Sequence, residues 1–160
     1  MQIEAQKEHR WLQRLIGNWI GEGEAVMGAD QPVQTWQIPE RVSGIGDVWV
    51  QCVAQGDMPG CGPAATVMTL GYDPARKHFV GTFIGSMMTH LWVYEGDLDE
   101  GGQQLTLRAQ GPDCSGNGRM VQYRDVITFR DDNHRELTSY MQAENGEWTQ
   151  IVKATYRRQP

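Results

Sequence analysis

His90, Trp92 and Tyr94 are the residues whose types and spacing best suit a binding site in this sequence. They alternate with Leu91 and Val93, and successive side chains of a β-strand point to opposite faces. The three would therefore share one strand face that offers aromatic surface, donors and acceptors. Small-molecule sites combine apolar walls with a few placed polar groups. If this face looks inward, the sequence predicts that it orients a ligand.

Large apolar side chains on the neighbouring strand-like runs would add adaptable wall to such a site. The predicted ligand-binding residues are Trp36, Trp49, Met68, Phe83, Met88, His90, Trp92, Tyr94 and Tyr140. The alternative is that these residues fill a packed interior or a dimer face.

No catalytic or metal motif of high specificity occurs in the chain. Ser86 lies shortly before His90 but lacks the Gly-x-Ser-x-Gly elbow of a hydrolase nucleophile. The run from Asp97 to Gly101 begins like a calcium loop without its later ligands, which favours a hairpin turn. Asp125 beside Arg124 is typical of a surface charge pair. We therefore expect no catalytic residue and no metal site.

One short helix followed by about ten strands would position the candidate residues. Trp11, Leu12 and Leu15 form an apolar stripe at helical spacing, which predicts a helix over about 2–16. Period-2 runs predict strands over roughly 19–27, 33–42, 47–55, 65–72, 78–84, 90–98, 104–109, 121–129, 135–142 and 148–157. Turn residues such as Asn145-Gly146 join strands that are neighbours in sequence. The prediction is one all-β domain, residues 1–160, whose up-and-down antiparallel barrel covers about 18–158.

Four segments carry a resemblance to a known family: 70–74 (LGYDP), 82–87 (TFIGSM), 95–97 (EGD) and 155–158 (TYRR). From Leu12 to Arg158 the chain resembles the bacterial family called domain of unknown function 1579. The resemblance implies a lipocalin-like, or calycin, barrel and brings no established activity. Barrels of this kind enclose one small ligand.

In such barrels a tryptophan near the start packs under a basic residue of the last strand, which implies a structural latch of Gly17, Trp19 and Arg158. Arg158 is favoured over Arg157 because it shares its strand face with the more apolar neighbours, Tyr156 among them. An arginine stacked on an indole contributes about 0.5–2 kcal/mol.

The run from Gly17 to Gly23 is also similar to the start of the nitrobindins, barrels that hold haem through a histidine. No Tyr-Pro follows these glycines, and none of the histidines lies in a recognisable haem-ligand context. We therefore expect no cofactor, with haem as an alternative.

Charge and composition narrow the classes of partner. The formal net charge of -6 opposes binding to nucleic acid and to anionic membranes. Without an apolar leader or a membrane-length stretch, a soluble cytoplasmic protein is expected. Cys52, Cys61 and Cys114 are odd in number and lack C-x-x-C spacing, so reduced thiols are expected.

The function favoured by the sequence is a noncatalytic barrel that binds a small hydrophobic or amphipathic molecule in its interior. One alternative is an enzyme of isomerase or hydrolase type in the same cavity, with His90 and Tyr94 in acid–base roles. Another is a filled scaffold that acts as a homodimer.

Overall fold

A computed structural model describes residues 2–26, 30–60 and 62–160 and contains one helix and ten strands within these ranges. The elements are α1 (Lys7–Gln13), β1 (Gly17–Ala25), β2 (Gln34–Ile45), β3 (Trp49–Met58), β4 (Gly62–Asp73), β5 (His78–Gly85), β6 (Trp92–Leu98), β7 (Gln104–Pro112), β8 (Met120–Asp131), β9 (His134–Gln142) and β10 (Trp148–Arg158).

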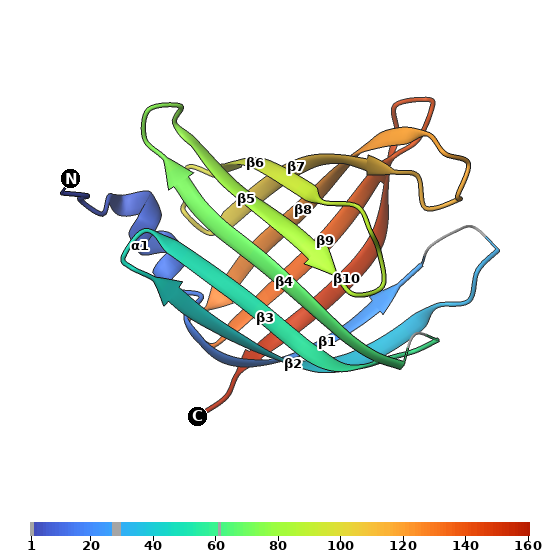
Figure 1. Ribbon diagram of the computed structural model, residues 1–160, viewed down its shortest axis with the longest axis horizontal. Coiled ribbons are helices and arrows are strands. Elements are labelled where there is room, and N and C mark those ends of the chain that lie inside the picture. Colours follow the sequence, from blue (N-terminus) through green and yellow to red (C-terminus); the bar gives the residue numbers. More distant parts are fainter. Residues whose placement is uncertain (1, 27–29, 61) are drawn as a thin grey trace.

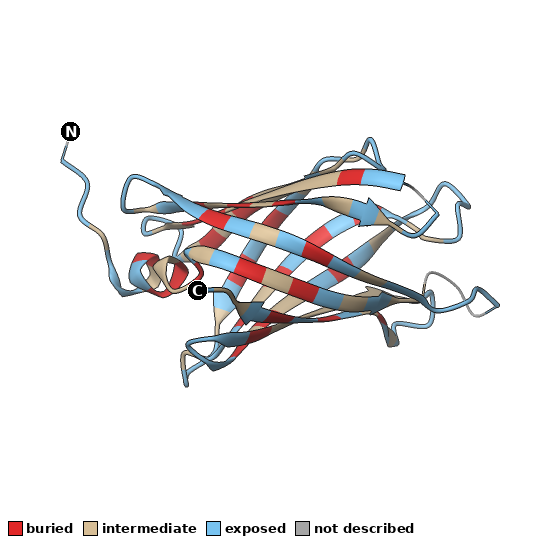
Figure 2. Ribbon diagram, turned by 90° about the horizontal axis from the view of Figure 1, so that it is seen from below, coloured by how far each residue is buried: buried red, intermediate tan, exposed pale blue. Residues whose placement is uncertain are grey.

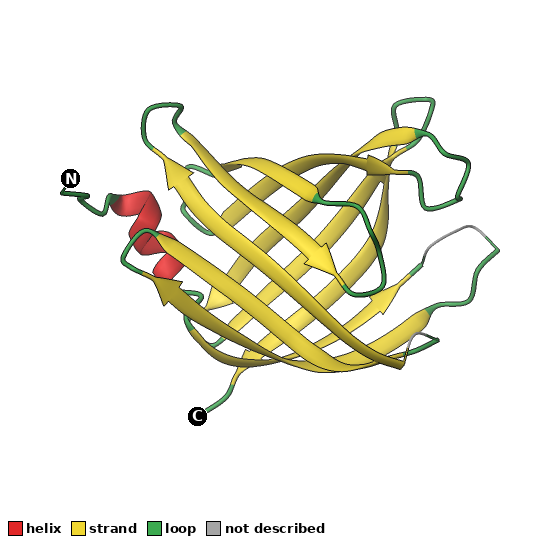
Figure 3. Cartoon of the chain, viewed as in Figure 1, coloured by secondary structure: helices red, strands yellow, loops and turns green. Residues whose placement is uncertain are grey.

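The ten strands form a closed barrel in which each strand pairs with its neighbours in sequence and β1 pairs with β10 (Figure 1). All ten pairings are antiparallel. Helices and strands are distinguished in Figure 3, where the short helix lies at one end of the barrel. The predicted up-and-down antiparallel barrel with an N-terminal helix is confirmed, with α1 shorter than the predicted helix.

Buried and exposed residues alternate along the strands, because interior-facing and exterior-facing side chains alternate in a barrel (Figure 2). On β7, Leu105, Leu107 and Ala109 are buried, whereas Gln104 and Arg108 between or beside them are exposed. The buried set therefore identifies which side chains point into the barrel on each strand.

The helix α1 covers the end of the barrel that we call the closed end. It is anchored there by hydrogen bonds to the turns between strands: the Trp11 indole N–H donates to the Gly102 carbonyl at 2.6 Å, and the Gln13 amide donates to the Asp47 carbonyl at 2.7 Å. Leu12 of the helix and Leu15, which follows the helix, are 1% and 0% exposed and belong to the core. The core is therefore densest at the closed end.

His9 of α1 is a buried polar member of this plug. Its Nδ1 accepts a hydrogen bond from the Gln6 backbone N–H at 2.9 Å. Because Nδ1 is the acceptor, Nε2 carries the proton and donates to the Tyr72 carbonyl at 3.0 Å. Both ring nitrogens are thus used in holding the helix on the barrel.

The residues of the latch meet beside the helix. The Arg158 guanidinium lies 4.2 Å from the centre of the Trp19 ring and donates to the carbonyls of Ile16 and Arg14 at 2.6 and 2.8 Å. Gly17 has a φ of 141°, and a Cβ there would fall 2.5 Å from the Arg158 side chain. The glycine therefore makes room for the arginine that caps the carbonyls at the end of the helix.

Candidate ligand-binding site

The inward-facing side chains change character along the barrel. Near the closed end Leu70 and Phe79 are fully buried, but Met68 and Phe83, further along the same inward faces of β4 and β5, are only partly buried. Trp36 on β2 and Trp92 on β6 also point inward far from α1 and are only partly buried. These four side chains lie in the half of the barrel opposite α1, which we call the open half, and keep some exposure to solvent.

Two of the aromatic rings in the open half lie against the barrel wall over glycines. A Cβ on Gly23 would fall 2.2 Å from the Trp36 ring, and one on Gly111 would fall 2.1 Å from the Trp92 ring. Each ring thus occupies the space that a side chain of the neighbouring strand would fill. Flat aromatic surface is the result, which suits the apolar wall of a ligand site.

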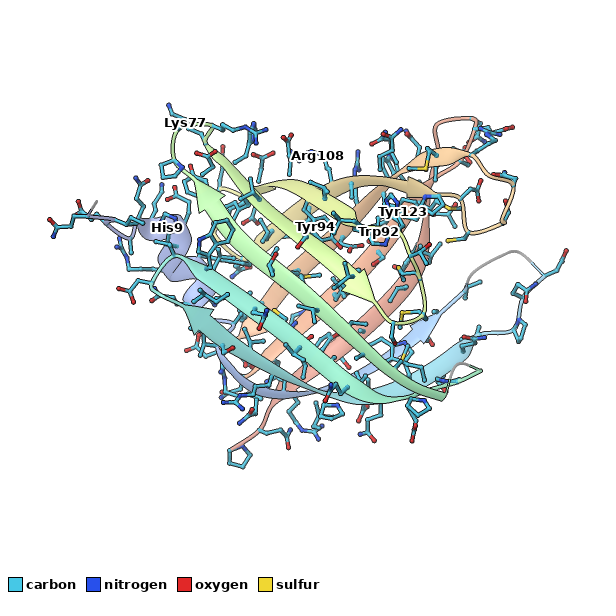
Figure 4. The ribbon with its side chains drawn as sticks, viewed as in Figure 1. His9, Lys77, Trp92, Tyr94, Arg108 and Tyr123 are labelled. Atoms are coloured by element: carbon cyan, nitrogen blue, oxygen red, sulfur yellow. The ribbon has the colours of Figure 1, made fainter. Side chains whose placement is uncertain are left out.

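Trp92 is the centre of an aromatic cluster at the rim of the open half. Its ring meets those of His90 and Tyr123 edge-on, each at 4.8 Å between centroids, and Trp92 and Tyr123 lie next to one another in Figure 4. The indole N–H donates to the Met88 sulfur at 3.0 Å, and Nε2 of His90 bonds the Gln110 carbonyl at 3.0 Å. These contacts tie segment 86–91 to the rim.

Deeper in the barrel lies an ion pair between Arg135 of β9 and Glu40 of β2, whose side chains are 5% and 12% exposed. The guanidinium also stacks on Tyr156, 4.0 Å from the ring centre, and lies 4.6 Å from that of Trp19. Burial, with a further contribution from Glu40, raises the pKa of Tyr156. The same two effects raise the pKa of the neighbouring Cys52 thiol. Both groups therefore stay neutral at physiological pH.

A second polar group, centred on Asp125 of β8, lies between Tyr94 and Ser139. The Tyr94 hydroxyl donates to Oδ2 of Asp125 at 2.5 Å, and the Ser139 hydroxyl also bonds this carboxylate. Burial raises the pKa of Asp125, and the two hydroxyl bonds partly offset that rise. The pKa of Tyr94 is raised well above its usual value by burial and by the carboxylate beside it. Asp125 forms no ion pair with any residue in the described ranges.

The interpretation of Asp125 and Arg124 as a surface charge pair is therefore wrong. Adjacent residues of a strand face opposite ways, and here Asp125 faces inward with its buried neighbours Tyr123 and Ile127. Arg124 faces outward, where its guanidinium lies 3.9 Å from the centre of the Trp148 ring.

The structure separates the predicted ligand-binding residues into three groups. Five point into the barrel: Trp36, Met68, Phe83, Trp92 and Tyr94. Met88 and His90 lie in the segment before β6 and contact Trp92 at the rim.

Trp49 and Tyr140 lie on the outer face and do not line the interior. Trp49 precedes the buried Val50, is 43% exposed and packs over Gly71. Tyr140 follows the buried Ser139, and its side chain therefore points outward. Neighbouring residues of a strand point to opposite faces of the barrel wall. An apolar residue one position away from the inward-facing set therefore points outward.

A hollow of about 670 Å³ lies over β1, β2 and β10, and Gly23 and Trp36 are among its lining residues. Most of its lining residues alternate with the inward-facing ones and so point outward: Glu22, Glu24, Thr35, Gln37, Lys153 and Thr155. It is wide open to solvent and is lined by side chains of both charges, unlike the mostly apolar and enclosed sites that bind small molecules.

Within the described residues, no group of three or more His, Cys, Asp or Glu side chains is arranged to hold a metal ion. No helix among them is long and apolar enough to cross a membrane. Cys52 and Cys114 are free thiols, and Cys61 lies outside the described residues.

Two solved structures share the fold of this chain. One is the crystal structure of Rv2717c from M. tuberculosis, with 14% identity over 98% of this chain and 100% of that one and a TM-score of 0.66. The other is the S-type phycobiliprotein lyase CPES from Guillardia theta, with 12% identity over 97% and 94% and a TM-score of 0.63.

The comparison with curated proteins gave no match. A family model described as protein of unknown function (DUF1579) matches residues 4–158, nearly the whole length of the barrel and its helix. The chain belongs to this DUF1579 family.

Proposed function

We propose that this protein binds a small amphipathic molecule in the open half of its barrel. The observation that supports the proposal most is the inward-facing set Trp36, Met68, Phe83 and Trp92, which stays partly exposed above a polar layer. The ligand's apolar part packs on this set, and its polar end points to Tyr94 and Asp125.

The energetics favour such an occupant over solvent. Covering partly exposed apolar surface contributes roughly 25 cal/mol per Å², so even part of the Trp92 ring is worth on the order of 1 kcal/mol. The wall is held in place by rim contacts before any ligand enters, since His90 and Met88 fix Trp92. A preformed wall reduces the entropy lost on binding.

The test is a fluorescence titration with an apolar, environment-sensitive probe such as 1-anilinonaphthalene-8-sulfonate or a neutral dansyl amide. Trp92→Ala is expected to weaken binding of the neutral probe about tenfold, because the ring contributes apolar contact. Trp49→Ala is the matched control, since it removes the same side chain from the outer face. Equal affinities of the two variants, or no binding by the unmodified protein, would count against the proposal.

The enzyme alternative draws less support from the geometry. Its two candidate groups do not act on each other in this structure, because His90 bonds the Gln110 carbonyl and Tyr94 bonds Asp125. The haem and homodimer alternatives, and the cytoplasmic location, stay predictions from the sequence. An outer apolar patch of Ile84, Leu91 and Val93, each at least 50% exposed, is the feature that favours a dimer.

A further inference from the structure

We infer that the polar end of the ligand is a cationic nitrogen, of the class of a protonated primary amine, that pairs with Asp125. This inference rests on the proposed function and names the ligand's chemistry at the same site. Three observations carry it: the balance of charge inside the barrel, the position of Asp125, and the aromatic rings beside it.

The charged groups inside the barrel do not all form ion pairs. Arg135 and Glu40 neutralise one another in a buried ion pair. Arg158 serves backbone carbonyls at the closed end. Asp125 receives hydrogen bonds from the hydroxyls of Tyr94 and Ser139, which supply no positive charge.

A carboxylate in a protein interior without a cation is costly, and a cation that reaches it gains a charge-assisted hydrogen bond. Among the inward-facing charges of the described residues, Asp125 therefore lacks a counter-charge.

Asp125 faces the interior below the open end of the barrel. The residue as a whole keeps some exposure to solvent, while its carboxyl group is deeply buried. β8 begins at the open end with Met120, so Tyr123 lies one inward position nearer to the opening than Asp125. On β6, Trp92 likewise lies one inward position nearer to the opening than Tyr94. A molecule that enters between the strands' open ends passes these two rings before it meets the carboxylate.

The rings of Trp92 and Tyr123 suit a cationic amphiphile. Their centroids are 4.8 Å apart, and Figure 4 shows Tyr94, Trp92 and Tyr123 along the same part of the barrel. Aromatic faces attract cations as well as alkyl groups. An alkyl amine would thus have its chain on the rings and its ammonium group at Asp125.

An anionic head group has a less suitable partner. Arg135, the one buried arginine among the described residues, is 5% exposed and lies against Tyr156 and Trp19. Its unpartnered Nε is buried, and Glu40 already neutralises its charge. A carboxylate ligand would have to displace Glu40 or separate these rings.

The test compares three probes of equal chain length, octylamine, octanoate and octan-1-ol, by isothermal titration at pH 7. The unmodified protein is expected to bind octylamine about tenfold more tightly than octan-1-ol, as one charge-assisted hydrogen bond implies. Asp125→Asn should remove this preference, so that octylamine and octan-1-ol bind the variant with similar affinity. Asp57→Asn, which removes the same charge from the exposed outer face of β3, should retain the preference.

A second variant keeps the result independent of folding defects. Tyr94→Phe removes a hydrogen bond to Asp125 but keeps the carboxylate, so the preference for octylamine should persist. If octanoate or octan-1-ol binds as tightly as octylamine, or if Asp125→Asn keeps the preference, the inference is wrong while the proposed function stands. If none of the three probes binds, the proposed function fails with it.

Discussion

At the scale of single residues, Asp125 is the buried carboxylate to which we assign the polar end of the ligand. Its carboxylate is held inward by two hydroxyl groups, without an ion pair in the described chain. Burial favours the protonated form in the folded state and so raises the pKa. Groups kept in unfavourable surroundings are found where a protein binds or reacts. This residue was missed by sequence reasoning, because an acid next to an arginine is common on a surface.

Asp125→Asn is expected to change how stability depends on pH. The folded-state pKa lies above the unfolded value of about 3.9, so the folded state binds the proton more tightly and the free energy of unfolding falls as pH rises through this interval. Asparagine does not titrate, so the variant should gain stability relative to the unmodified protein as pH rises from 4 to 8. Urea unfolding at the two pH values measures this. A gain that is larger at pH 4 than at pH 8 would contradict the assignment, and Asp57→Asn is the control.

At the scale of elements, α1 acts as the cover of the closed end. Seven residues are too few for a helix that is stable alone. Its stability comes from Leu12 in the core and from hydrogen bonds to the turns, such as that of Trp11 to Gly102. Because the candidate site lies in the opposite half, the helix supports the barrel without lining the site.

Leu12→Ala tests this role of α1. Removing a side chain that is 1% exposed should lower the free energy of unfolding by about 2–5 kcal/mol. Ile3→Ala, at a position that is 67% exposed, should change it by less than about 0.5 kcal/mol. Both are measured by urea unfolding. Similar losses for the two variants would show that α1 does not seal the barrel.

The strands show how far the sequence could predict the site. Period-2 runs and turn residues predicted the meander, because each connection is short and joins sequence neighbours. Which face of each strand points inward was harder to predict, since both faces carry apolar residues: Trp49 alternates with Val50, and Tyr140 with Met141. Only the closed barrel shows which face is inward. The polar interior, Glu40 and Arg135 above all, has no local signal because its partners come from strands that are distant in sequence.

At the scale of the whole molecule, the barrel has two unlike halves. The closed half is filled by the core and covered by α1, whereas some inward side chains of the open half, Trp36, Met68, Phe83 and Trp92, are only partly buried (Figures 1 and 2). In a barrel packed evenly from end to end, the inward side chains of both halves would be buried to the same degree. The arrangement favours a receptor for one small molecule over a solid scaffold.

Native mass spectrometry of protein purified gently from its host is the most direct measurement of whether the open half holds a ligand. We predict a species heavier than the bare chain, whose extra mass is a basic small molecule released on denaturation. Trp92→Ala should reduce the heavier species, and Trp49→Ala should leave it unchanged. A spectrum that shows only the bare chain in repeated gentle preparations would contradict the central claim that the open half is a ligand-binding site.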